Sequence, residues 1–174
     1  MSTPAPPDYP PPIVDLLAEE SPTAARRQLE TFDFTSAVAP RPVEDASMAE
    51  ACESGLWLRH QFLDESHQVS QQIDTPTGSY WHGIMHRREG DFGNAKYWFR
   101  RVVPHPVFSE LAAAAHQIAP QVFSDSTPWD PFDFVDRCQA AARGPAADSV
   151  LQAVESAEWD LLFAFCFRQA LDVE

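Results

Sequence analysis

The sequence has little of what identifies the commonest enzyme classes. It has only 6 glycines in 174 residues, and it contains no glycine-rich phosphate loop, dinucleotide-binding fingerprint or GxSxG nucleophile motif. Its three cysteines, Cys52, Cys138 and Cys166, are far apart and lack CxxC spacing, so neither a disulfide framework nor a cysteine-rich zinc site is indicated. These absences argue against classical hydrolases and nucleotide-binding enzymes.

Basic residues are also scarce. The 12 lysines and arginines face 26 acidic residues, which gives a formal net charge of −14. Such a surface repels nucleic acid and anionic membrane, so we expect a small molecule or another protein as partner. No apolar run approaches the roughly 20 residues of a membrane span, and the opening MSTPAPPDYPPP lacks the regions of a signal peptide. We therefore expect a cytoplasmic protein.

Apolar residues, by contrast, are plentiful enough for a substantial core. They make up 44% of the chain, and aromatic residues make up 11%. The first twelve residues contain six prolines and almost no apolar side chains, a composition typical of a mobile, extended segment. The sequence therefore predicts a disordered Pro-rich tail over residues 1–12 and a single helical domain over residues 13–174.

Helical periodicity dominates the chain, and no alternating strand pattern of useful length occurs. Helices are predicted over residues 24–32, 44–53, 56–73, 80–89, 92–103, 107–118, 131–143 and 146–171. Ser21-Pro22 is a helix start signal, and Gly90-Asp91 is a tight junction. Because the links are short, neighbouring helices should run antiparallel. The expected fold is all-α, a compact multi-helix bundle with antiparallel helical hairpins.

The hairpin predicted between Gly55 and Val103 carries four of the six histidines. The spacing i, i+4, i+7 occurs twice, in His60, Asp64 and His67 and again in His82, His86 and Glu89. Residues at this spacing line one face of a helix. The short turn after residue 73 should bring His67 level with His86 and Asp64 level with Glu89. Six potential ligands would then face each other.

Imidazole and carboxylate together suit a divalent transition metal such as zinc, iron, manganese or nickel, and helical bundles build such sites from facing helices. The preferred ligands are His67, His82, His86 and Glu89, with His60 and Asp64 as further candidates. The sequence lacks the HExxH motif and the Glu-x-x-His pairs of di-iron bundles. The first interpretation is thus a small metalloprotein, or a metal-dependent enzyme acting on a small molecule.

A second interpretation starts from the hairpin itself. The residues Gly83, Gly90, Asp91, Phe92, Ala95 and Phe99 resemble one tetratricopeptide repeat hairpin. The resemblance implies that His82 and His86 are buried neutral residues, hydrogen-bonded to backbone or to Tyr80, in a non-catalytic scaffold that binds a partner protein or peptide. Ser79 stands where the repeat has its leading Trp, and no second copy is present.

The longer stretch SYWHGIMHRREGDFGNAKYWFRR resembles a signature segment of a family of uncharacterised bacterial and fungal proteins without an assigned activity. This resemblance covers about residues 55–108. It implies that the hairpin is the structural centre of the family, and it names no reaction.

Basic residues gather in the same segment. Five of the twelve lie within fifteen positions, namely Arg87, Arg88, Lys96, Arg100 and Arg101. An anion-binding site is one interpretation. The other is that these side chains form ion pairs with nearby acids such as Asp64, Glu65, Glu89 and Asp91.

Overall fold

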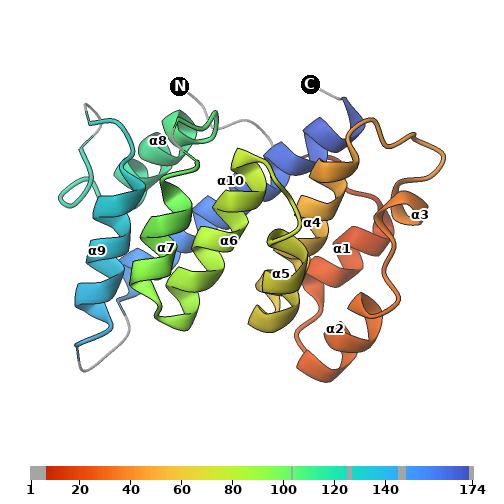
Figure 1. Ribbon diagram of the computed structural model, residues 1–174, viewed down its shortest axis with the longest axis horizontal. Coiled ribbons are helices and arrows are strands. Elements are labelled where there is room, and N and C mark those ends of the chain that lie inside the picture. Colours follow the sequence, from red (N-terminus) through yellow and green to blue (C-terminus); the bar gives the residue numbers. More distant parts are fainter. Residues whose placement is uncertain (1–6, 103, 125–126, 145–147, 173–174) are drawn as a thin grey trace.

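The computed structural model describes residues 7–102, 104–124, 127–144 and 148–172 (Figure 1). Ten α-helices and no strands are found in these ranges. They are α1 (Pro11–Ala18), α2 (Pro22–Leu29), α3 (Phe34–Val38), α4 (Ala46–Arg59), α5 (Leu63–Ser70), α6 (Pro76–Glu89), α7 (Phe92–Phe99), α8 (Phe108–Ile118), α9 (Pro131–Ala141) and α10 (Ser149–Leu171). The prediction of an all-α bundle with antiparallel hairpins is confirmed.

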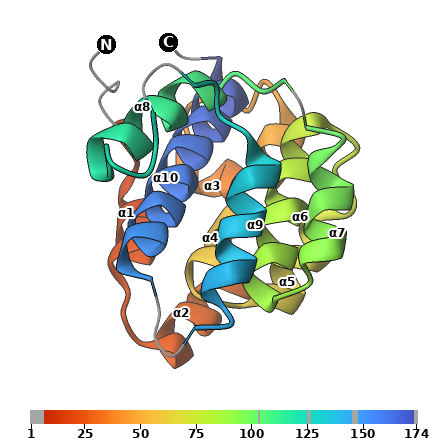
Figure 2. The same cartoon turned by 90° about the vertical axis from the view of Figure 1, so that its left-hand side faces the viewer.

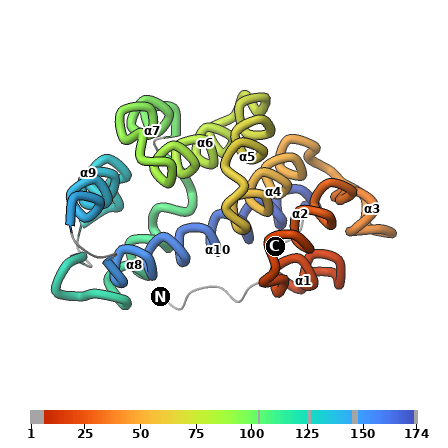
Figure 3. Tube along the Cα trace, turned by 90° about the horizontal axis from the view of Figure 1, so that it is seen from below, coloured from red at the N-terminus to blue at the C-terminus, as the bar shows by residue number. Residues whose placement is uncertain are grey.

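Helix α10 is the longest of the described helices. In the view from below, α4, α5, α6, α7 and α9 form a curved row on one side of α10, and α1 and α8 lie on the other side (Figure 3). Contacts join α10 to α4 and α8, and they join each helix of the row from α4 to α7 to the next, with α7 packed on α9. Figure 2 shows α9 beside the α6–α7 pair, with α10 on the other side of α9.

Helix α6 occupies the middle of the row and is buried on almost every side, from Thr77 to Arg87. The Trp81 indole nitrogen lies 3.4 Å from the Cys166 sulfur in α10, and the Tyr80 hydroxyl donates to Glu158 of α10 at 3.0 Å. Since α6 meets α4, α5, α7 and α10, its polar side chains need partners inside the protein.

The prediction of one continuous helix over residues 56–73 is wrong. Helix α4 continues through Gly55 and ends at Arg59, and α5 begins only at Leu63. Gln61 adopts a left-handed φ of 64°, and the Phe62 amide donates to the Trp57 carbonyl at 3.0 Å. The Trp57 and Phe62 rings then pack at 5.6 Å, which completes a Schellman motif. Here the left-handed residue is Gln, so the sequence carries no glycine signal for the break.

Part of the segment predicted to be a disordered tail, residues 1–12, is helical. Pro11 and Pro12 belong to the first turn of α1, a position that suits proline because its missing N–H would be unpaired there anyway. Tyr9 packs on Phe163 and Phe167 of α10, with ring centroids 5.4 and 4.9 Å apart. Residues 1–6 lie outside the described residues. Within the described ranges, no helix is both long and apolar enough to cross a membrane.

Candidate metal centre

Three histidines from two antiparallel helices meet at the α5–α6 contact. His67 comes from α5, and His82 and His86 come from successive turns of α6. Their ring centroids are 4.5 Å apart for His67 and His82, 5.5 Å for His67 and His86, and 4.8 Å for His82 and His86. One ligand nitrogen from each lies within 4.8 Å of the other two. The predicted juxtaposition of His67 and His86 is therefore found.

His82 is the innermost member of this cluster, which we call the histidine triad (His67, His82 and His86). Its side chain is only 2% exposed, and its ring stacks on Trp98 of α7 with centroids 3.9 Å apart. Burial, reinforced by the neighbouring His86 and His67, lowers the pKa of His82 to about 3. The imidazole is thus neutral at pH 7, and one ring nitrogen keeps a lone pair available for a metal.

The Nδ1 atom of His82 is buried and has no hydrogen-bond partner among the described residues. The Tyr80 hydroxyl, which the second interpretation offered as a partner, donates to Glu158 instead. An unpaired buried polar atom costs roughly 1–3 kcal/mol. The expectation of fully hydrogen-bonded core histidines therefore fails at His82.

A carboxylate orients the second α6 histidine. The Nδ1 atom of His86 lies 2.6 Å from Oε1 of Glu89, one turn later on the same helix. When Nδ1–H donates to Glu89, the lone pair of His86 is on Nε2, the arrangement in which a carboxylate fixes the tautomer of a metal-binding histidine. Asp91 lies beside this pair, and His86, Glu89 and Asp91 also place one potential ligand atom each within 4.8 Å.

Two predicted ligands lie elsewhere. His60 is the C-cap of α4, outside α5, and its Nε2 lies 2.9 Å from the carbonyl oxygen of Leu16. The Schellman break at residue 61 removes it from the helix that carries His67. Asp64 is exposed in the first turn of α5 and belongs to neither group of ligand atoms found in the described part of the chain.

Sequence reasoning missed two neighbours of the triad. Asp91 was assigned to the helix junction and to the acids expected to pair with arginines, and its place two residues after Glu89 was a usable signal that it lies near His86. The stacking of Trp98 on His82 has no signal in the sequence, because that contact depends on how α6 and α7 cross.

Two of the five clustered basic residues, Arg87 and Lys96, form ion pairs with acids other than those predicted. Arg87 pairs with Glu155 and Glu158 of α10, and Lys96 pairs with Asp136 of α9 at 2.5 Å. Glu65, a predicted partner, pairs with Arg26 instead. These ion pairs connect helices that are distant in sequence, so helical spacing alone could not reveal them.

The other three make no ion pair within the described ranges. Arg88 donates to the Leu58 carbonyl at 2.8 Å, Arg101 lies over the Trp98 ring at 5.1 Å, and Arg100 is exposed. The cluster is therefore distributed over several surfaces and does not form one patch.

Comparison of the chain with protein-family models, with curated proteins and with solved structures gives no match.

Proposed function

We propose that the protein binds one divalent transition metal at the histidine triad and uses it in chemistry on a small molecule. The observation that carries the proposal is the convergence of three imidazoles from α5 and α6, one of them buried with an unpaired nitrogen. A metal bound through Nδ1 of His82 would give that buried atom a partner.

The donor set favours zinc or a neighbouring first-row metal. Three histidine nitrogens match the protein ligands of a catalytic zinc site, in which water or substrate takes the fourth position. With Zn–N bonds of about 2.1 Å, tetrahedral ligands lie about 3.4 Å apart, so binding would draw the present nitrogens, up to 4.8 Å apart, closer together.

The triad lies near the protein surface, where a substrate could reach a bound metal, and this supports a catalytic role in addition to a structural one. His67 is half-buried, and Glu89 and Asp91 are exposed, so the triad reaches the protein surface on that side. An open position on the metal would polarise a substrate carbonyl or activate water. Glu89, which contacts His86, would keep that imidazole oriented toward a bound metal.

Titration of chelator-treated protein with Zn²⁺ tests the proposal. Wild-type protein should bind about one equivalent, and His86→Ala should bind little because it loses a ligand at the centre of the triad. The control is His116→Gln, since His116 lies on α8 and its Nδ1 contacts the Phe123 carbonyl at 2.8 Å. Equal binding by both variants would overturn the assignment.

The alternative function is a tetratricopeptide-like scaffold for a partner peptide. One observation favours it: a Cβ added at Gly83 would lie 3.1 Å from the Phe99 ring, so α6 and α7 approach closely in the manner of a repeat hairpin. A scaffold role requires no metal, so the titration also separates the two functions.

A further inference from the structure

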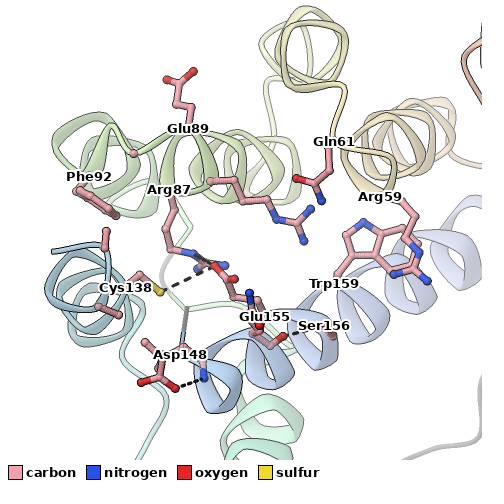
Figure 4. Close-up of a pocket in the computed structure, with 16 residues that line it drawn as sticks. Arg59, Gln61, Arg87, Glu89, Phe92, Cys138, Asp148, Glu155, Ser156 and Trp159 are labelled. Atoms are coloured by element: carbon pink, nitrogen blue, oxygen red, sulfur yellow. Dashed lines mark hydrogen bonds and ion pairs between the residues drawn. The ribbon is translucent and has the colours of Figure 1, made fainter. Parts of the chain in front are cut away.

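A pocket of about 680 Å³ lies on the other side of α6 from the histidine triad. It is bordered by the end of α6, by α9, by the first half of α10 and by the α4–α5 connection. Figure 4 shows Glu89 pointing away from this pocket while Arg87 points into it. None of the three triad histidines lines it, and Glu89, the partner of His86, reaches only its rim. The inner pocket is therefore a separate feature of the molecule.

The floor of the pocket is a buried ionic network. The Arg87 side chain is 0% exposed, and its guanidinium pairs with Glu158 and, at 3.3 Å, with Glu155. Glu158 also accepts the Tyr80 hydroxyl at 3.0 Å. Because these groups satisfy one another, Arg87 is a fixed part of the fold and is not free to take a ligand.

Two further arginines face the pocket without a carboxylate of their own. Among the described residues, neither Arg59 nor Arg88 has an acidic oxygen within 4.0 Å. Arg88 donates to the neutral carbonyl of Leu58, and Arg59 lies over the Trp159 ring, 5.7 Å from its centroid. Burial, and then repulsion by Arg87, lowers the pKa of Arg88, so its charge is poorly compensated.

The charged and apolar side chains that line the pocket indicate which class of ligand it would bind. The three positive charges of Arg59, Arg87 and Arg88 face the two negative charges of Glu155 and Glu158, which leaves about one positive charge around the inner pocket. Two other carboxylates lie at the rim: Glu89 points away from the pocket, and Asp148 caps the start of α10. In Figure 4 the Gln61 side chain points into the pocket from the α4–α5 connection and adds a neutral polar group. Phe92 and Trp159 supply apolar wall. Arginine pairs with carboxylates in bidentate geometry.

We propose that this pocket binds a small organic monocarboxylate, whose carboxylate is held by Arg88 and Arg59 and whose apolar part lies against Trp159. The proposal is independent of metal binding, because it uses the opposite face of α6.

The test uses benzoate as probe, chelator-treated protein and the indole N–H signals in a ¹H–¹⁵N NMR spectrum. The Trp159 indole donates to the Gly55 carbonyl at 2.9 Å beside the pocket, whereas Trp98 lies at the histidine triad. Benzoate should shift the Trp159 signal saturably and leave the Trp98 signal in place. Benzamide, the uncharged analogue, should shift neither.

Two variants and one control locate the carboxylate. Arg88→Gln should weaken benzoate binding at least about tenfold, since a charge-assisted hydrogen bond contributes about 1.5–3 kcal/mol. Arg59→Gln changes an exposed side chain and should weaken binding in a protein with an unchanged helical spectrum, even if Arg88→Gln fails to fold. Arg100→Gln, also exposed and outside the pocket, should bind like wild type.

Three results would overturn the proposal: no saturable Trp159 shift with benzoate, equal benzoate affinity in wild type and Arg59→Gln, or tighter binding of inorganic phosphate than of benzoate. Either of the first two results would show that the pocket does not bind a carboxylate in this way, and the third would show that it binds a different class of anion.

Discussion

His82 is buried against Trp98 with one ring nitrogen unpaired, and this single side chain carries much of the chemistry proposed here. A second buried histidine, His105, is different because both of its nitrogens have contacts. Its Nδ1 accepts from the Val107 amide at 3.3 Å, and its Nε2 lies 3.2 Å from the Thr77 hydroxyl. His105 is therefore held by hydrogen bonds within the fold, whereas His82 has a buried ring nitrogen without a hydrogen-bond partner among the described residues.

Both histidines make the metal-free protein sensitive to acid. Burial lowers the pKa of His105 to about 4 and that of His82 to about 3, from an ordinary value of 6.5. As the pH falls below 6.5 the unfolded state takes up protons that the native state refuses, so stability present above pH 6.5 is lost toward pH 4, by about 1.4 kcal/mol per pH unit for each group. Urea unfolding at pH 7.5 and pH 5 measures this loss.

The variant His105→Gln isolates one of these groups from the carboxylates that titrate nearby. Its free energy of unfolding should fall less between pH 7.5 and pH 5 than that of wild type. An identical fall in the two proteins would show that His105 is protonated equally in the native and unfolded states.

Glu89 should strengthen metal binding without itself being a metal ligand. We expect Glu89→Gln to weaken Zn²⁺ binding about tenfold, the usual effect of losing a carboxylate that orients a histidine ligand, while His86→Ala loses nearly all binding. Competition with a chromophoric chelator measures both. If Glu89→Gln binds as poorly as His86→Ala, Glu89 is itself a ligand.

At the scale of helices, the sequence correctly predicted those helix ends that depend on a single capping residue. Ser21 caps α2, and Gly90, with a φ of 89°, ends α6, as expected from their side chains. The α4–α5 break could not be foreseen, because Gln61 takes a conformation that glycine normally takes. This error placed His60 wrongly, whereas His67 was placed correctly because its register depends only on the short α5–α6 link.

The Schellman break therefore predicts a stabilising substitution. Gln61→Gly should raise the free energy of unfolding by up to about 1 kcal/mol, since glycine adopts a left-handed φ without steric cost. Gln71→Gly is the matched control, because Gln71 ends α5 with a right-handed φ of −68° and glycine there should destabilise. Thermal or urea unfolding checks both, and a loss of stability in Gln61→Gly would contradict the assigned conformation.

At the scale of the whole molecule, the contacts between α10 and α6 are a part of the fold that the sequence did not predict. Glu158 is completely buried and binds Arg87 and Tyr80 of α6, more than 70 positions away. The all-α class followed from periodicity, but the pairing of α10 with α6 depends on tertiary packing that has no local signature. The pocket beside Arg88 was missed for the same reason.

The N-terminal segment is part of this assembly. Because Tyr9 packs on two phenylalanines of α10, Tyr9→Ala should reduce the free energy of unfolding by about 2 kcal/mol, somewhat less than for a fully buried aromatic residue. Asp8→Ala, next to it and exposed, should have little effect. Urea unfolding of the two variants gives the comparison, and equal stabilities would show that the Tyr9 contact contributes nothing.

The metal content of the protein tests the central claim most directly. Protein purified without an affinity tag or chelator should contain close to one transition-metal ion per chain by elemental analysis, bound by the histidine triad, and the His86→Ala variant should contain almost none. Wild-type protein that is isolated without metal, and that takes up none of zinc, iron, manganese, nickel or copper on reconstitution, would contradict the claim.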